Sequence, residues 1–146
     1  MLSAARSLLF NRVLAFRVTS GSWNTPLLGE RLMLDGSRSS FLAEQIDSEL
    51  EQRYHSMDIH TSGPLWGQGD VMISGKIAEM EAAVVENEAL LREGLERYGL
   101  KMERRALRMP VSDLNWSIQG TRLTLEFSLP KGSFATSLLR ECISYS

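Results

Sequence analysis

Cysteine is nearly absent from this 146-residue sequence, and several classes of protein are excluded by what it lacks. The single cysteine, Cys142, excludes an intrachain disulfide framework and a zinc finger built on cysteine ligands. No run approaches the roughly 20 consecutive apolar residues that a membrane-spanning helix needs, so we expect no membrane partner. With 43% hydrophobic and 23% charged residues, the composition is that of a globular chain long enough to bury a core.

The sequence also lacks the short motifs of common enzyme and metal sites. It contains no G-x-x-x-x-G-K-[ST], no G-x-S-x-G and no H-E-x-x-H. Its two histidines, His55 and His60, do not share one helix face, and no cysteine or further histidine lies nearby to complete a metal site. We therefore expect no metal, interpret both histidines as exposed polar residues, and interpret Cys142 as a small packing residue.

Charge is distributed unevenly along the chain, although the formal net charge is only −2. Residues 1–20 carry +3, residues 21–100 carry −8 and residues 101–146 carry +3. Of the 16 cationic residues 13 are arginine, the side chain suited to bidentate phosphate contacts and to stacking on bases. Two interpretations stay open: solvated surface charge, or two basic ends that the fold brings together as a surface for a polyanion.

Hydrophobic periodicity and turn residues predict an α+β chain. We predict helices over residues 1–18, 43–54, 76–98 and 134–143, the third beginning after Ser74 and stopping at Gly99. Short strands are expected over 31–34 and 40–43, a hairpin over 114–129 that turns at Gln119-Gly120, and loops over 21–26 and 61–69.

Both ends of the sequence carry apolar surface that they cannot cover themselves. The first helix is apolar nearly all round, which predicts burial on several faces. The last 37 residues amount to a two-stranded hairpin and a short helix, a combination that is marginally stable alone in water. Both ends therefore look like parts of a larger domain.

The segment at residues 129–141, LPKGSFATSLLRE, combines features of a ligand site. A strand ends at a proline, a glycine follows, and Ser133 begins a helix whose free N–H groups can receive an anion. Phe134 lies in the same turn, where an aromatic ring can stack on an extruded base. The alternative is that Phe134 anchors the helix in a hydrophobic core.

Four segments together carry a family resemblance: SAARSLLFNRV at 3–13, TSGPLWG at 61–67, RRALR at 104–108, and GSFATS at 132–137 with Arg140-Glu141 after it. In this order they make nearly the whole chain similar to the C-terminal part of the TruD family of tRNA pseudouridine synthases. The resemblance implies an α+β fold. Residues 1–108 would form the inserted α/β domain peculiar to the family, and 109–146 the last hairpin and helix of the catalytic domain.

The resemblance implies an isomerase that converts a uridine in the D arm of tRNA, usually uridine 13, to pseudouridine without a cofactor. The family's catalytic aspartate lies in a Lys-Asp motif followed by an Asn-x-Phe motif, and neither motif occurs in this sequence. We therefore expect a fragment that lacks the catalytic residue and is inactive alone, but contributes RNA binding and one wall of the uridine pocket. The alternatives are a stand-alone RNA-binding module without catalysis and a truncated, inactive gene product.

The resemblance assigns one substrate-binding residue, Phe134, which matches the family's phenylalanine that contacts the target uridine. The partner it implies is tRNA, and we expect a cytoplasmic monomer. Each candidate arginine is equally compatible with a structural ion pair. The candidates for contact with the RNA backbone are Arg6, Arg12, Arg104, Arg105, Arg108, Lys131 and Arg140.

Overall fold

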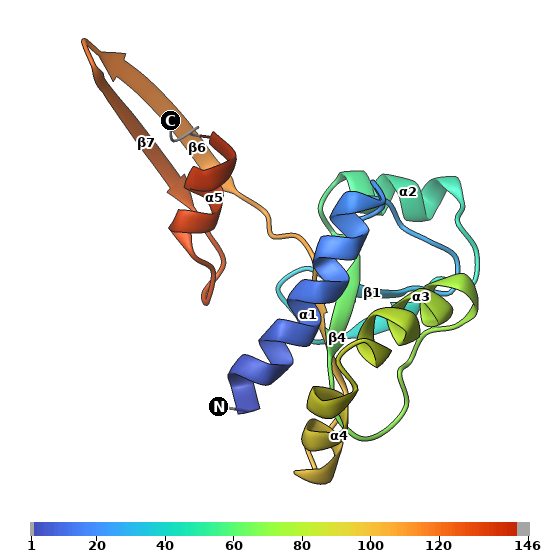
Figure 1. Ribbon diagram of the computed structural model, residues 1–146. Helices are drawn as coiled ribbons and strands as arrows, with labels where there is room; N and C mark the ends of the chain where they lie inside the picture. The colour runs from blue at the N-terminus through green and yellow to red at the C-terminus, as the bar shows by residue number, and fades with distance from the viewer. Residues whose placement is uncertain (1, 143–146) are drawn as a thin grey trace. The chain divides into compact units, whose positions relative to one another are not determined.

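The computed structural model describes residues 2–142, and the chain divides into two compact units, residues 1–108 and 109–146 (Figure 1). Both units combine helices with small antiparallel sheets, which confirms the predicted α+β class. Within residues 2–142, no helix has both the length and the apolar character needed to cross a membrane.

The first unit places its helices around two small sheets. A three-stranded antiparallel sheet has the order β2-β1-β3, and β4 pairs antiparallel with β5. The elements, in chain order, are α1 (Leu2–Thr19), β1 (Arg31–Leu34), β2 (Ser40–Leu42), α2 (Ser48–His55), β3 (Ile59–His60), β4 (Ser62–Leu65), α3 (Gly75–Glu86), α4 (Ala89–Arg97) and β5 (Glu103–Ala106).

Two hydrophobic clusters hold the first unit together. Helix α1 packs on β4, α3 and α4, and its Leu9 and Val13 are fully buried. Around them lie Trp66, Val85, Leu95 and Met102. The second cluster joins the three-stranded sheet to α2 through Leu32, Ala43, Leu50, Tyr54 and Ile59. Full burial of a leucine or valine contributes about 1.5–3 kcal/mol, so these clusters are the main source of stability.

Helix α1 confirms the first predicted helix, but it is buried on one side only. Leu8, Phe16 and Val18 are exposed, so the expectation of burial on several faces is wrong for the described residues. Arg17, on the buried side, is completely enclosed. A charge in this position requires a partner, which is the Glu30 carboxylate.

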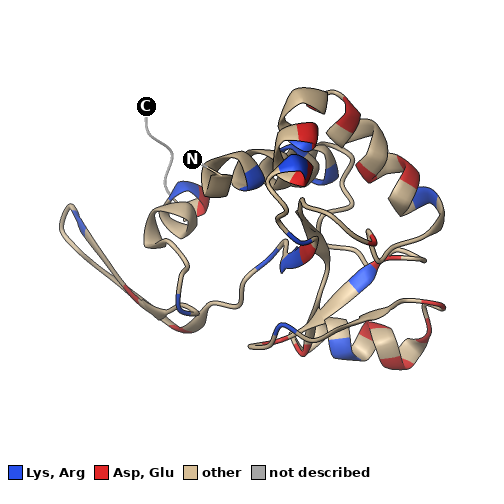
Figure 2. Ribbon diagram, turned by 90° about the horizontal axis from the view of Figure 1, so that it is seen from below, with Lys and Arg blue, Asp and Glu red and all other residues tan. Residues whose placement is uncertain are grey.

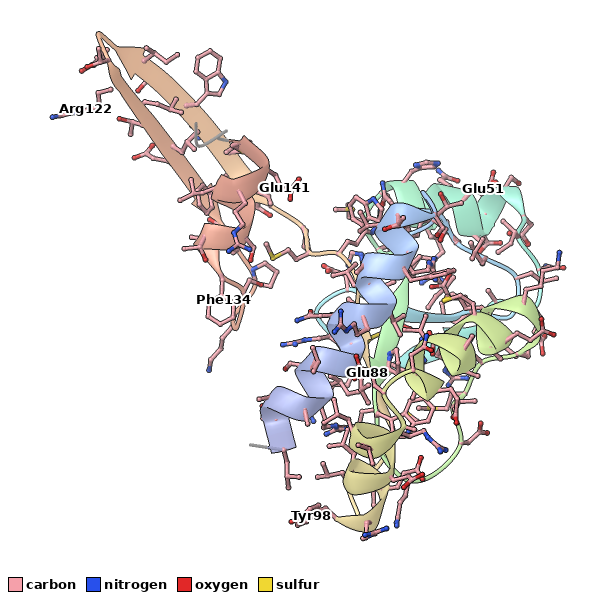
Figure 3. The ribbon with its side chains drawn as sticks, viewed as in Figure 1. Glu51, Glu88, Tyr98, Arg122, Phe134 and Glu141 are labelled. Atoms are coloured by element: carbon pink, nitrogen blue, oxygen red, sulfur yellow. The ribbon has the colours of Figure 1, made fainter. Side chains whose placement is uncertain are left out.

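The single helix predicted over residues 76–98 is wrong, because the structure contains two helices there. Asn87 and Glu88 form a turn, in which the Glu88 N–H donates to the Val85 carbonyl. Asparagine is a weak helix former, and Glu88 instead pairs with Arg12 of α1 at 3.0 Å. Figure 3 shows Glu88 where α3 meets α4. The predicted boundaries at Ser74 and Gly99 are confirmed: Ser74 precedes α3, and Gly99 adopts a positive φ after α4.

The helix predicted over 43–54 begins five residues later than expected. Asp47 caps α2 by accepting a hydrogen bond from the Leu50 N–H at 2.9 Å. Ala43 does not join the helix, because its N–H donates to the Glu30 carbonyl and its carbonyl accepts from Gly29. The residues between Ala43 and Asp47 form an irregular connection from β2 to α2.

The segment expected to be a loop over 61–69 contains strand β4, which pairs with β5. Two of its glycines are explained by close packing. A Cβ at Gly63 would lie 3.1 Å from the Phe10 ring, and a Cβ at Gly67 would collide with the backbone of Leu100 and Lys101. Gly63 therefore leaves room for the Phe10 ring, and Gly67 lets two backbone segments approach each other, so the role of both is packing and not loop flexibility.

The second unit is a hairpin followed by a helix, as predicted: β6 (Ser112–Gln119), β7 (Arg122–Ser128) and α5 (Ala135–Cys142). Gly120 has a positive φ in the predicted turn. Helix α5 begins one residue after Phe134, and the predicted helix end at Ile143 lies outside the described residues. Cys142 is exposed, so its interpretation as a packing residue is wrong for the described structure.

We predict that backbone amides of the β6–β7 hairpin exchange with solvent faster than those of β4 and β5. Trp116, Ile118 and Leu123 of the hairpin are exposed, whereas most of β4 is buried. Strands without a covered face open at low free-energy cost. Hydrogen exchange on the 146-residue chain measures this directly, and uniformly slow exchange in a monomer would contradict it.

Candidate nucleic-acid interface

The loop between β7 and α5 presents Phe134 to solvent. The Ser133 N–H donates to the Pro130 carbonyl at 3.1 Å, Gly132 adopts a positive φ, and the Phe134 carbonyl receives the first helical bond from the Ser137 N–H. Phe134 stands at the start of α5 and is 72% exposed (Figure 3). Within the described residues the ring does not anchor α5 on the β6–β7 hairpin, so its face is free to contact another molecule or another part of the protein. Lys131 and Arg140, from the same segment, are also exposed.

Arg104 faces the opposite way from its neighbour Arg105, because successive residues of strand β5 point to opposite sides. The Arg104 guanidinium forms two hydrogen bonds to the Glu81 carboxylate of α3, at 2.7 and 2.8 Å. The side chains of this pair are 1% and 2% exposed. The structure therefore supports the ion-pair alternative for Arg104, whose side chain is enclosed and does not reach solvent.

Ser62 connects the Arg104 pair to a second buried ion pair. The Ser62 carbonyl accepts from Arg104 at 2.8 Å, and the Ser62 N–H donates to the Glu30 carboxylate at 3.3 Å. Glu30 binds Arg17 at 2.9 Å, with both side chains fully enclosed. Burial raises the pKa of Glu30, while the charge of Arg17 acts in the opposite direction. Sequence reasoning counted Arg17 only among the basic residues of the N-terminal end. Its complete burial, its pairing with Glu30 and its bonds to the Ser22 and Thr25 carbonyls show that it belongs to the interior.

Arg108 is held by a polar cluster that includes His60. Its Nε donates to His60 Nδ1 at 3.1 Å, and its guanidinium lies 3.5 Å from the centre of the Tyr54 ring. Because arginine can only donate, His60 must carry its proton on Nε2, which donates to Asp35 at 2.7 Å. His60 is buried, so the expectation that it is an exposed polar residue is wrong.

The remaining bonds of Arg108 make it a structural side chain. Its guanidinium also donates to the Asn24 side chain at 2.9 Å and to the Ile59 carbonyl at 2.9 Å. Burial lowers the pKa of Arg108 from its ordinary value, yet an arginine starts far above neutrality and stays charged. Burial also raises the pKa of the neighbouring Tyr54 hydroxyl. Arg108 therefore has a structural role like that of Arg104, but through hydrogen bonds to neutral groups, because it forms no ion pair within the described residues.

Arg6 and Arg12 lie on α1 in different surroundings. Arg6 donates to the carbonyls of Leu65 and Lys101, each at 2.7 Å, and pairs with Glu103 at 3.1 Å. Arg12 is mostly exposed and pairs with Glu88. Arg6 therefore positions the start of α1 against β4 and β5, while Arg12 makes an exposed ion pair of small energy.

Arg105 is exposed on the outer side of β5, with its guanidinium 5.6 Å from the centre of the Phe10 ring. Arg38, which sequence reasoning missed, is exposed in the turn between β1 and β2. Figure 2 shows basic and acidic positions interspersed over the first unit. Nothing in the sequence around Arg38 distinguishes it from a solvated turn residue, and only the fold places it near Arg105. Residues 2–142 contain no group of three or more histidine, cysteine, aspartate or glutamate side chains that could hold a metal ion.

We predict that Arg104→Met destabilises the chain by about 3–5 kcal/mol, because it leaves the Glu81 carboxylate buried without a partner. The double variant Arg104→Met/Glu81→Leu should recover much of this loss, since it removes both charges. Urea denaturation at neutral pH measures both values.

The matched control is Arg12→Met, which breaks the exposed Arg12–Glu88 pair and should cost about 1 kcal/mol or less. Equal losses for Arg104→Met and Arg12→Met would contradict a special role for the buried pair.

Comparison with known proteins agrees with the motifs and the fold. The family model described as tRNA pseudouridine synthase D (TruD) matches residues 1–142. The chain is 48% identical to tRNA pseudouridine synthase D of Methylococcus capsulatus and 50% identical to that of Nitrosococcus oceani. These matches cover 99% and 98% of this chain, which spans about 40% of the length of these relatives (41% and 40%).

A crystal structure of a TruD protein from Methanosarcina mazei has a similar fold, with a TM-score of 0.69 and 23% identity. It is matched over 93% of this chain and 36% of its own. The sequence motifs, the fold and the relatives all indicate one family, and the chain belongs to the TruD family of tRNA pseudouridine synthases.

Proposed function

We propose that this chain forms the part of a tRNA pseudouridine synthase that binds tRNA and supplies one wall of the pocket for the target uridine. The observation that carries this proposal is the family match over residues 1–142, which includes an exposed Phe134 at the start of α5. The substrate would be a uridine in the D arm of tRNA, at position 13 as is usual in the family.

The two units receive different roles in this proposal. Residues 1–108 correspond to the inserted domain of the family, and residues 109–146 to the last hairpin and helix of the catalytic domain. The division of the chain between Arg108 and Met109 supports this assignment. The exposed apolar residues of the β6–β7 hairpin also support it, because a hairpin from a larger sheet carries a face that other strands or helices cover.

The chemistry of the reaction needs a nucleophile that these 146 residues do not contain. In the family an aspartate of a Lys-Asp motif takes part in breaking the N-glycosidic bond, the base rotates, and it is rejoined through carbon. Neither the Lys-Asp nor the Asn-x-Phe motif occurs in the chain. Its own residues would bind and orient tRNA, without a metal, cofactor or membrane, as a cytoplasmic monomer.

The exposed cations are the residues that would contact the RNA backbone. Arg105, Lys131 and Arg140 are exposed, and an arginine or lysine in water can exchange its counterions for phosphate oxygens. Arg12 is a weaker candidate, since it already pairs with Glu88. Arg6, Arg104 and Arg108 would act indirectly, by holding the fold that presents the others.

A second candidate function is RNA binding without catalysis, which the exposed Arg105, Lys131 and Arg140 would support equally well. An assay of the purified chain with unmodified tRNA transcripts separates the possibilities. We predict measurable binding and no pseudouridine, because positioning groups cannot replace a missing nucleophile. Conversion at the rate of an intact family enzyme would contradict the prediction, and the absence of any binding would favour an inactive product.

We predict that Phe134→Ala has little effect on the stability of this chain but a large effect on catalysis. Because the side chain is 72% exposed, its loss should change the free energy of unfolding by no more than about 0.5 kcal/mol. A core anchor would cost about 3–5 kcal/mol instead. Thermal melting of the variant measures this effect.

In a full-length synthase that contains this segment, stacking worth about 1–3 kcal/mol predicts a loss of about one to two orders of magnitude in kcat/KM. Phe134→Tyr and Phe134→Trp should retain more activity than Phe134→Ala, because each keeps an aromatic face. A Phe134→Ala enzyme that isomerises uridine normally would remove Phe134 from the pocket.

A further inference from the structure

An open cavity of about 630 Å³ lies in the first unit, between the start of α1, the turn that joins β1 to β2, and the β4–β5 pair. Three regions that are far apart in the sequence therefore line the same cavity. Its polar lining comes from all three regions: Ser3, Arg6 and Ser7 from α1, Arg38 and Ser40 from the β1–β2 region, and Glu103, Arg104 and Arg105 from β5. We call this the Arg38–Arg105 cavity. Its volume is within the range of about 300–1,000 Å³ that is typical of ligand pockets.

The cavity has an excess of positive charge, although the chain as a whole is acidic. Four arginines line it, and two of these are neutralised: Arg6 by Glu103, and Arg104 by Glu81. Arg38 and Arg105 have no carboxylate partner within the described residues. The remaining two charges face a concave surface, where a bound anion would experience both.

The lining also supplies directed donors and apolar surface. Ser3 and Ser7 are one helical turn apart on the same side of α1, so both hydroxyls can donate in one direction. The contact of Arg105 with the Phe10 ring limits the positions of its guanidinium, whose planar fork matches phosphate oxygens. Leu65, Met72 and Leu100 provide an apolar wall against which a sugar or base can lie.

We propose that the Arg38–Arg105 cavity binds a backbone phosphate of tRNA together with part of its nucleotide. The inference rests on the proposed function, because it takes tRNA as the partner of this chain. Arg38 and Arg105 would contact phosphate oxygens, and Ser3 and Ser7 would donate to the same group or its neighbour. The site reads no base edge, so it contributes affinity and orientation on tRNA and not sequence preference.

The test is a titration of fluorescent tRNA with the 146-residue chain, followed by anisotropy at several salt concentrations. Each phosphate contact contributes about 0.7–0.9 to the slope of log affinity against log salt. Arg38→Gln and Arg105→Gln should each weaken binding and reduce this slope by about 0.7, and the double variant by about 1.4. Thermal melting should stay unchanged in all three, because both side chains are exposed.

Two control variants separate a specific site from a general effect of charge. Lys76→Gln removes one exposed positive charge in the same unit, at a different cavity, and should leave the slope unchanged. Glu103→Gln removes the one carboxylate in the lining and leaves the charge of Arg6 without its ion pair, so it should strengthen binding.

Four outcomes overturn the proposal. An unchanged slope in the double variant, with wild-type tRNA binding intact, overturns the cavity and leaves the proposed function standing. A reduction of the salt slope in Lys76→Gln equal to that in Arg38→Gln or Arg105→Gln shows that net charge, and not the cavity, causes the effect. Displacement of tRNA by AMP at equal concentration assigns the cavity to a free nucleotide. A wild-type chain that does not bind tRNA overturns the cavity and the proposed function together.

Discussion

The buried polar chain through Ser62 is the interaction on which the first unit depends. It links Arg17, Glu30, Ser62, Arg104 and Glu81, and so joins α1, β4, β5 and α3 in the interior. Each charge would be costly to bury alone, and the pairs become tolerable only when all of these elements are in place. The arrangement makes docking of the elements mutually dependent. An element that packed without its partner would leave an uncompensated charge.

The segment RRALR contributes both to this buried network and to the exposed surface. In RRALR the alternation of a strand sends Arg104 inward to Glu81 and Arg105 outward to solvent. The final arginine, Arg108, anchors the end of the first unit through His60 and neighbouring carbonyls. The buried Arg104 holds strand β5 in place, and the position of β5 determines where the exposed Arg105 lies. Loss of an inward arginine would therefore displace the outward one.

Local signals in the sequence predicted most elements but not the contacts between distant segments. The hairpin, the first helix and the boundaries at Ser74 and Gly99 follow from periodicity and capping, which act over a few residues. The break at Asn87, strand β4 and the burial of His60 depend on partners far along the chain. The motif at 132–137 was visible, because a family resemblance marks it. The cavity around Arg38 could not be predicted from the sequence, because its walls come from three separate regions of the chain.

The polar cluster around His60 also limits what the first unit can contribute to a reaction. Both ring nitrogens of His60 are engaged, one accepting from Arg108 and the other donating to Asp35. An imidazole in this state has neither a free lone pair nor a free N–H for a reacting base. His60 instead links Asp35, in the turn after β1, to Arg108, the last residue of the first unit. Proton transfer through this imidazole would therefore require one of these two hydrogen bonds to break first.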